Sequence, residues 1–438
     1  MDRLPQYRRY AWYVVGMLWL ISFFNYADRQ AIFSLFPLLQ KEMHLTPVQL
    51  GLLGSSFAWV YGISAPFAGN VVDRIRRKTA ILGGLLAWSS IAMLTSLAHS
   101  FRQLFSFMAM EGLGETFYYP ASMSMISDYH GRATRSRAMG THQTSVYVGT
   151  IAGGAFAGLI GEHYGWRWSF IFFGGLGILL AFILMRLLRE PNRGDADFRD
   201  MGSSKDAHLE ERMSLGTFLK LLYATPTALL LMAAFVCANF VAMVLLSWMP
   251  KFLYDKFNLS LAMAGLSATI FVQAASVVGS PLGGWLADAL RKRTPGGRMI
   301  VQAVAVLCGA PFVVLCARAG SMGWVIVALT AWGLFKGLYD SNIFASLYDV
   351  IAPEARGTAA GFMNMVGWLG GGGLAPILIG YLAEREGLSM AISSAATVYA
   401  VAGLLLIVAI VVFARRDVAR AGSGAKWNNR SATDIKKN

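Results

Sequence analysis

Five charged side chains stand within stretches of sequence that are otherwise apolar: Asp28, Arg29, Glu115, Lys336 and Asp340. Inserting a charged side chain at the middle of a bilayer costs at least ~2.5–3.5 kcal/mol, so each such residue is expected to have an interaction partner or a function. Buried carboxylates are suited to proton binding and release, and cations are suited to attracting an anion. We therefore expect these five residues to form the functional site.

Asp28 and Arg29 are adjacent, so on a helix they point about 100° apart and do not pair well with each other. We expect one of them to face a neighbouring helix and the other to face a cavity. The alternative is that both lie at the membrane interface. The apolar run that follows them, residues 31–39, favours the embedded position.

Glu115 belongs to a segment in which glycines allow close helix approach, Glu111 lies one turn earlier and Pro120 interrupts the backbone hydrogen bonds. A buried glutamate that loads and releases a proton near neutral pH would serve proton coupling. The alternative is a glutamate permanently neutralised by one arginine.

Lys336 and Asp340 are four residues apart and share one helix face, with Tyr339 one turn from Lys336. An internal ion pair is one interpretation. In the other, Lys336 attracts an anionic substrate while Asp340 holds it in place. Asp28, Glu115 and Asp340 are the candidate proton-coupling carboxylates.

The candidate substrate-binding residues combine cations with hydroxyl, amide and aromatic groups. They are Arg29, Lys336, Tyr118, Tyr339, Gln143, Tyr147 and Asn364. Any one of the uncharged residues alone is more typical of a hydrogen bond between helices than of a ligand contact.

The amino-acid composition indicates which kind of fold holds these residues in place. Of 438 residues, 56% are apolar and 14% charged, whereas a soluble domain is about 25% charged. Apolar stretches of ~20 residues span a bilayer. We predict an all-α membrane protein with twelve transmembrane helices, in two six-helix bundles related by pseudo-twofold symmetry. The predicted spans are residues 11–39, 47–72, 79–98, 102–128, 136–161, 166–188, 219–250, 260–287, 298–317, 321–350, 357–382 and 388–414. We expect the first to be a membrane helix and not a cleaved signal peptide.

The net charge of +14 follows the same topology. With both termini cytoplasmic, 29 of the 38 Lys and Arg residues fall in inward segments or at the span ends that border them, and seven fall in outward segments or at their bordering span ends. This asymmetry is the positive-inside rule. It predicts a multi-pass protein of the cell membrane with cytoplasmic N- and C-termini, and it argues against nucleic-acid binding.

One long polar stretch, residues 190–215, divides the chain. It predicts a cytoplasmic linker between an N-terminal six-helix bundle (1–189) and a C-terminal six-helix bundle (216–416), with a cytoplasmic tail (417–438).

The two halves also repeat. The segment Gly69-Asn-Val-Val-Asp73-Arg-Ile-Arg-Arg-Lys78 is echoed by Gly284-Trp-Leu-Ala-Asp288-Ala-Leu-Arg-Lys-Arg293, and Asp128 matches Asp349 at an offset of 221. A parallel repeat of two six-helix bundles is a known transporter construction.

The first of these loops resembles the signature of the major facilitator superfamily, and the resemblance covers residues 10–415. The second copy departs from it, with Ala289 where an Arg would stand. The candidate gating residues are Asp73, Arg74, Arg77 and Asp288. They would latch one bundle to the other in one conformation. The alternative is that the basic residues serve topology alone.

Two branches of the superfamily share features with Tyr26-Ala-Asp28-Arg29 and Gly112-x-Gly114-Glu115. One is the anion:cation symporter branch, which residues 348–361 resemble more closely, and the other is the spinster branch. The resemblance implies that Asp28 and Glu115 couple transport to protons. It also implies that Arg29 either binds a carboxylate or acts as a gating residue. Both branches usually have an Arg where this chain has Met108, so Lys336 is the candidate partner of Glu115.

Together these features predict a secondary active, proton-coupled transporter that moves a small organic anion, a monocarboxylate or sugar acid, by alternating access. The alternatives are a spinster-like exporter of lysolipids or amphiphiles and, more distantly, a nontransporting membrane receptor. The sequence lacks a nucleophile–base constellation, a cofactor loop and metal-ligand spacing. We therefore expect no enzyme activity, cofactor or metal. The expected partners are the anion, a proton and the lipid bilayer, and the expected state is a monomer.

Overall fold

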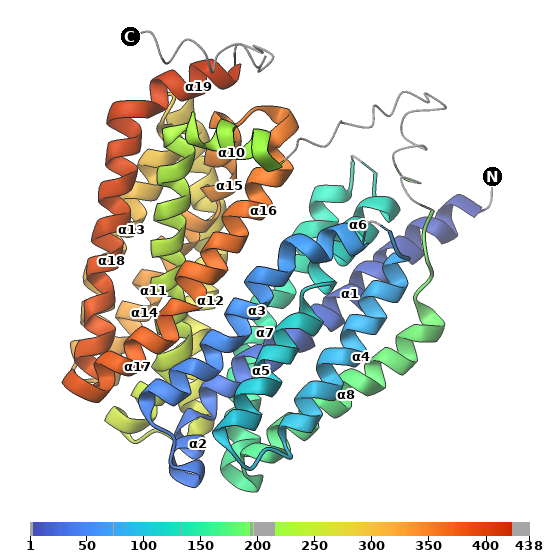
Figure 1. Ribbon diagram of the computed structural model, residues 1–438, viewed down its shortest axis with the longest axis vertical. Helices are drawn as coiled ribbons and strands as arrows, with labels where there is room; N and C mark the ends of the chain where they lie inside the picture. The colour runs from blue at the N-terminus through green and yellow to red at the C-terminus, as the bar shows by residue number, and fades with distance from the viewer. Residues whose placement is uncertain (1–2, 73, 132, 193–195, 197–214, 423–438) are drawn as a thin grey trace.

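The computed structural model describes residues 3–72, 74–131, 133–192, 196 and 215–422, and the regular elements within these ranges are helices. Figure 1 shows two bundles side by side, the N-terminal one in blue to green and the C-terminal one in yellow-green to red. They approach each other at the bottom of the view and diverge at the top, where α19 and the start of α1 lie. The predicted architecture, all-α with two bundles, is confirmed.

The helices of the N-terminal bundle are α1 (Arg3–Ser34), α2 (Phe36–Met43), α3 (Pro47–Val72), α4 (Arg77–Thr95), α5 (Phe101–Glu115), α6 (Tyr118–Tyr129), α7 (Arg135–Tyr164) and α8 (Trp166–Leu187). An α-helix rises about 1.5 Å per residue. The 30 residues of α7 therefore extend well beyond the ~30 Å hydrocarbon layer.

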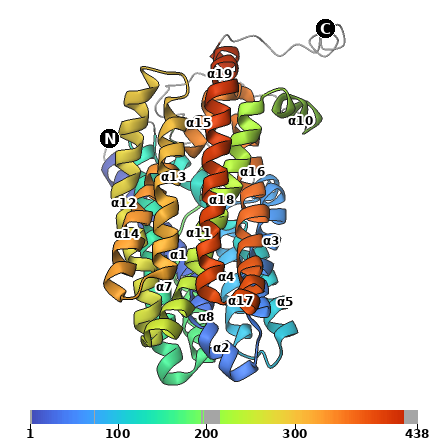
Figure 2. The same ribbon diagram turned by 90° about the vertical axis from the view of Figure 1, so that its left-hand side faces the viewer.

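The C-terminal bundle contains α10 (Leu215–Tyr223), α11 (Pro226–Phe257), α12 (Leu261–Arg291), α13 (Gly297–Arg318), α14 (Met322–Asp340), α15 (Ile343–Val350), the 3₁₀ turn η1 (Pro353–Ala355), α16 (Arg356–Val366), the π-helix η2 (Gly367–Gly372), α17 (Leu374–Glu386), α18 (Leu388–Val408), the π-helix η3 (Ala409–Phe413) and α19 (Ala414–Gly422). In Figure 2, α18 and α13 run along the length of this bundle. The predicted linker, residues 190–215, and the end of the predicted tail lie largely outside the described residues.

Ten helices of the described chain are long and apolar enough to cross a membrane. The first and fourth predicted spans are not among them. The first carries Asp28 and Arg29, and the fourth is divided between α5 and α6 directly after Glu115. The two spans that differ from the others are therefore those that carry the charges of the N-terminal bundle.

The division of the fourth span has a counterpart in the second half. The α5 helix ends at Glu115, and α14 ends at Asp340, before the short helix α15. Each half thus interrupts the corresponding span beside a charged residue of the predicted site. This correspondence agrees with the repeat seen in the sequence.

At the lower end of Figure 1 the two bundles pack closely because glycines line the contact. A Cβ atom added at Gly158 of α7 would meet the backbone of Leu261 in α12, and one added at Gly51 of α3 would meet the backbone of Pro376 in α17. The backbone N–H of Val48 also donates to Glu384 Oε1 at 3.1 Å. The closure is therefore made largely of backbone against backbone.

We expect Gly158→Val to weaken this closure, because the new side chain would force α7 and α12 apart. Overpacking costs about 1–3 kcal/mol, which shifts a two-state equilibrium roughly 5- to 150-fold. The check is the rate at which a cysteine at position 364, with the native cysteines replaced, reacts with an impermeant maleimide added on the side of the termini. We expect the rate to fall. Gly140→Val is the matched control, since a Cβ there meets open space; equal rates would contradict the prediction.

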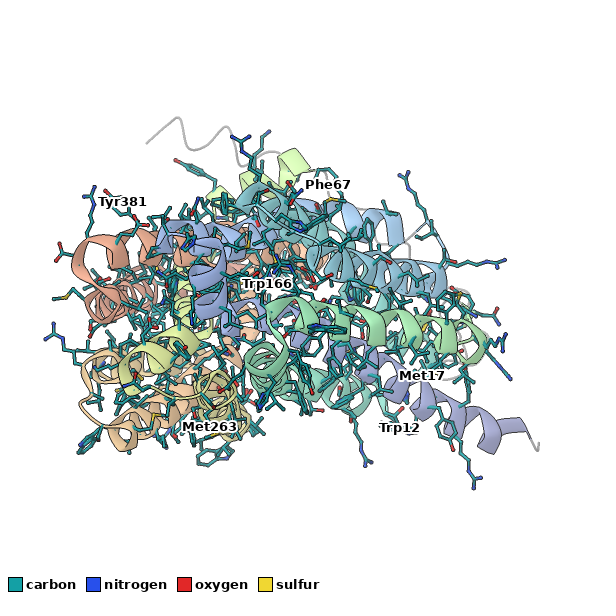
Figure 3. All side chains as sticks on the ribbon, turned by 90° about the horizontal axis from the view of Figure 1, so that it is seen from below. Trp12, Met17, Phe67, Trp166, Met263 and Tyr381 are labelled. Carbon is teal, nitrogen blue, oxygen red and sulfur yellow. The ribbon has the colours of Figure 1, made fainter. Side chains whose placement is uncertain are left out.

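The exterior of the bundles is apolar. Figure 3 places Phe67, Met263, Tyr381 and Trp12 at the periphery, whereas Trp166 lies within the molecule. Phe67 is 67% exposed and Trp166 is fully buried. An exposed apolar belt of this kind is suited to lipid and not to water.

Candidate functional site

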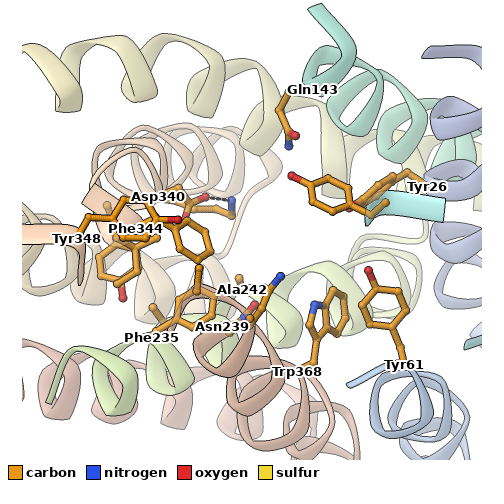
Figure 4. A pocket seen from close by; sticks show the side chains of 18 of the residues that line it. Tyr26, Tyr61, Gln143, Phe235, Asn239, Ala242, Asp340, Phe344, Tyr348 and Trp368 are labelled. Atoms are coloured by element: carbon orange, nitrogen blue, oxygen red, sulfur yellow. Dashed lines mark hydrogen bonds and ion pairs between the residues drawn. The ribbon is translucent and has the colours of Figure 1, made fainter. Parts of the chain in front are cut away.

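A central cavity of about 560 Å³ lies between the bundles and is lined from both of them (Figure 4). The N-terminal bundle contributes Tyr26, Tyr61, Tyr119 and Gln143. The C-terminal bundle contributes Phe235, Ala238, Asn239, Ala242, Lys336, Tyr339, Asp340, Ile343, Phe344, Tyr348, Ala360, Gly361, Asn364, Trp368 and Tyr399. The lining is aromatic with amide and hydroxyl groups, and its charges come from one wall.

That charged wall is the Lys336–Asp340 pair. Lys336 Nζ donates to Asp340 Oδ2, so the internal ion pair considered from the sequence is present. The side chain of Asp340 is 43% exposed and that of Lys336 16% exposed. A ligand in the cavity therefore meets the carboxylate and the ammonium together.

The structure brings only part of the predicted substrate-binding set into this cavity. Lys336, Tyr339, Gln143 and Asn364 line it. Tyr147 lies close enough to interact electrostatically with Lys336 and Asp340, but it is not a lining residue.

Tyr118 and Arg29 lie elsewhere. The Tyr118 hydroxyl donates to the Leu18 carbonyl at 2.6 Å and lies 2.8 Å from His142 Nε2, so it is engaged inside the N-terminal bundle. Its neighbour Tyr119 lines the cavity instead. The one-residue difference arises because adjacent positions on a helix point about 100° apart.

Glu115 has a partner other than the one expected. Arg29 Nε donates to Glu115 Oε2 at 3.2 Å, and Arg29 Nη2 donates to the same oxygen. The expectation that Lys336 pairs with Glu115 is therefore wrong. Arg29 reaches Glu115 within one bundle, whereas Lys336 is held by Asp340 on its own helix.

Asp28 faces away from Arg29, as adjacency on a helix requires, and is only 4% exposed. It lies close to Glu111, and Asp28 Oδ1 and Glu111 Oε1 are buried with no hydrogen-bond partner among the described residues. Both residues border a second, small cavity of about 20 Å³ that also contacts Arg29 and Met108. Neither Asp28 nor Arg29 lines the central cavity, contrary to expectation.

Aromatic rings enclose the Arg29 guanidinium. The distances from Arg29 Cζ to the ring centroids are 4.7 Å for Tyr26, 4.6 Å for Phe57, 5.2 Å for Tyr61 and 5.3 Å for Trp368. Cation–π attraction of this kind is strongest where water is excluded. A tyrosine three residues before Arg29 was the available sequence signal, because positions i and i+3 share a helix face.

Asp288, the candidate gating residue of the C-terminal bundle, belongs to a group of ion pairs within that bundle. Arg298 bonds to Asp288 and to Asp349, each at 3.0 Å, and Arg291 bonds to Asp349 at 3.1 Å. In this conformation these contacts hold the ends of helices together and do not cross between bundles.

The N-terminal copy follows the same plan. Arg77 pairs with Asp128, the repeat counterpart of Asp349. Glu190, which the sequence did not single out, accepts hydrogen bonds from the backbone N–H groups of Arg77 at 2.8 Å and Lys78 at 2.7 Å. A carboxylate there complements the N-terminal end of α4. Arg74 lies exposed in the turn after α3, and Asp73 lies outside the described residues.

The sequence is similar to known proteins. Residues 18–371 and 252–434 match the Major Facilitator Superfamily. The probable galactarate/D-glucarate transporter of Escherichia coli is 24% identical over 398 residues, covering 86% of this chain and 88% of that protein. Protein spinster of Drosophila melanogaster is 27% identical over 396 residues; the match covers 87% of this chain but only 64% of spinster, less than two thirds of its length.

The fold has a solved counterpart. A crystal structure of a bacterial homologue of the human lysosomal transporter spinster, inward-facing and occupied, superposes with a TM-score of 0.79 at 22% identity, covering 96% of this chain and 99% of that one. The family match extends over more than half of the sequence and agrees with the two bundles and the cavity between them. The chain is therefore a membrane transporter of the major facilitator superfamily and not an enzyme.

Proposed function

We propose that this protein is a secondary active transporter that carries a small organic anion, a monocarboxylate or sugar acid, together with a proton. The observation that carries this proposal is Lys336. Among the described residues that line the central cavity it is the only cation, and it faces a cavity of small-molecule size.

The uncharged lining supports a hydroxylated acid. Gln143, Asn239 and Asn364 offer amide donors and acceptors from both bundles, and tyrosine hydroxyls surround them. Polar groups that converge in this way suit a sugar acid, whose hydroxyls need partners once water is excluded. The similarity to a galactarate/D-glucarate transporter points in the same direction.

Proton coupling is supported by the carboxylates. Asp340 holds Lys336, so a proton on Asp340 would release the ammonium for the carboxylate of the substrate. Glu115 holds Arg29, and Glu115 Oε1 has no hydrogen-bond partner among the described residues. Asp28, beside Glu111, is a further proton site. In this arrangement Arg29 is paired with Glu115, and Lys336 is the cation that contacts the substrate.

The shape of the protein supports alternating access. The bundles are closed at one end by the glycine contacts and diverge at the end where α19 and the start of α1 lie (Figure 1). The excess of basic residues at that end supports a cytoplasmic location, and in our proposal this conformation is inward-open in a cell membrane. We propose that a monomer, with bundle boundaries at residues 1–189 and 216–416, rocks about the cavity.

A spinster-like lysolipid or amphiphile exporter is the second candidate, because aromatic rings dominate the cavity wall and spinster is among the similar proteins. The test uses purified protein in liposomes with an acidic exterior and a panel of radiolabelled sugar acids, monocarboxylates and a lysolipid. We expect pH-gradient-driven accumulation of at least one carboxylate. Movement of the lysolipid alone would reject the anion proposal.

A further inference from the structure

Trp368 is the one member of the aromatic enclosure of Arg29 that comes from the opposite bundle. Tyr26, Phe57 and Tyr61 belong to α1 and α3, whereas Trp368 lies in η2. The ring centroids of Trp368 and Tyr61 are 5.1 Å apart, and Figure 4 shows the two side chains next to each other at the cavity wall. The enclosure is therefore completed across the interface between the bundles.

Trp368 also borders both cavities. It lines the central cavity of about 560 Å³ and the small cavity of about 20 Å³ that contacts Asp28, Arg29 and Glu111. A space of the smaller size has room for about one water molecule. The indole thus stands between the place where a substrate would bind and the charged groups of the N-terminal bundle.

Two glycines pack closely against this indole. A Cβ atom added at Gly62 of α3 would lie 3.1 Å from Trp368 Cβ, and one added at Gly372 would lie 3.0 Å from Trp368 Cε3. Both are tight contacts, so a side chain at either position would press against Trp368. The π-helix η2 supplies the second glycine, and π-helical turns are frequent at functional sites.

We infer that Trp368 is a removable cover that separates the Arg29–Glu115 pair from the central cavity in this conformation. The cover and the pair belong to different bundles, so a rocking motion that parts α3 from η2 withdraws the indole and opens the pair to the cavity. Access to Glu115 is then tied to the conformational state. The consequence for protons rests on the proposed function, whereas the cover itself does not.

The cover is tested by chemical access to Arg29. Purified protein is treated with p-hydroxyphenylglyoxal, and modification of the peptide that contains Arg29 is followed by mass spectrometry. We expect Trp368→Ala to accelerate this modification at least roughly tenfold, equivalent to a barrier lowered by about 1.4 kcal/mol. Phe344→Ala is the matched control, since Phe344 lines the same cavity and is not one of the rings over Arg29.

Trp368→Leu is a second variant that keeps the test valid if Trp368→Ala does not fold. Leucine retains an apolar side chain but is narrower than an indole. Its rate should lie between those of the wild type and Trp368→Ala, with melting temperatures recorded for each variant. Modification of Arg29 at the wild-type rate in either Trp368 variant would overturn the inference.

A second measurement separates the cover from the proton. In liposomes with a pH gradient and no substrate, Trp368→Ala should leak protons faster than Phe344→Ala, because Glu115 is then open to the cavity. Faster modification of Arg29 without a proton leak would uphold the cover and reject Glu115 as a proton carrier. A leak in Trp368→Ala that is abolished by adding Glu115→Gln would support both.

Discussion

Lys336→Ala is expected to weaken the binding of a small carboxylate roughly 10- to 100-fold. The variant removes a charge-assisted hydrogen bond worth about 1.5–3 kcal/mol. It also leaves Asp340 without its partner at the cavity wall, which repels an anion. The measurement is the shift in melting temperature that each carboxylate of the panel produces in the purified variant. A lysolipid measured in parallel should depend far less on Lys336.

Lys251→Ala provides the matched control. Lys251 Nζ bonds to Asp255 Oδ2 at 2.6 Å, also four residues apart on one helix, but neither residue lines the cavity. This control should retain carboxylate protection. Lys336→Arg should recover only part of it, because the planar guanidinium presents its donors in a different geometry. Full protection by carboxylates in Lys336→Ala would reject Lys336 as the anion site.

Glu115→Gln is expected to abolish pH-gradient-driven accumulation while sparing substrate exchange. Glutamine keeps the shape of the side chain but cannot cycle a proton. Uptake against a gradient and counterflow into preloaded liposomes are measured on the same preparation. The first should fall to the level of empty liposomes, and the second should stay close to wild type.

The substitution also removes the carboxylate that pairs with Arg29. Breaking a buried ion pair lowers the free energy of unfolding by about 3–5 kcal/mol. Melting temperatures are therefore recorded, and Glu115→Asp, which keeps an ionisable group, is the control for coupling. Concentrative uptake by Glu115→Gln equal to wild type at every pH would remove Glu115 from the mechanism, and Asp28→Asn would then be tested in the same assay.

The sequence was sufficient for the fold because membrane spans follow from the length of apolar runs and from the placement of basic residues. It also identified the charged residues that stand inside the protein, since charges are rare there. Asp28 and Glu115 are indeed buried, and Arg29 and Lys336 each meet a carboxylate.

The pairing of these charges was not accessible from the sequence. Glu115 and Lys336 occupy matching positions of the repeat at an offset of 221, which suggested that they face each other. Residues at matching positions of the two bundles are expected only to lie at a similar depth in the membrane. The distance between them depends on how far apart the bundles stand, and each residue found a closer partner in its own bundle.

The enclosure of Arg29 by aromatic rings was not predicted for a related reason. Trp368 reaches Arg29 from more than 300 positions later in the chain, and its direction is set by the π-helix Gly367–Gly372. A run of glycines in the sequence indicates close packing but not a change of helical register. A one-residue shift there turns a neighbouring side chain away from the interface.

The pairing of every described cation in the site with a carboxylate has an electrical consequence. Moving one elementary charge through 100 mV changes the energy by about 2.3 kcal/mol, but a neutral pair that moves as a unit contributes nothing. Arg29 with Glu115 and Lys336 with Asp340 are such pairs. Under the proposed symport of one proton with one monocarboxylate, the cargo adds no net charge to these pairs. A membrane that has lost its voltage but kept its pH difference is then expected to keep driving the proposed uptake.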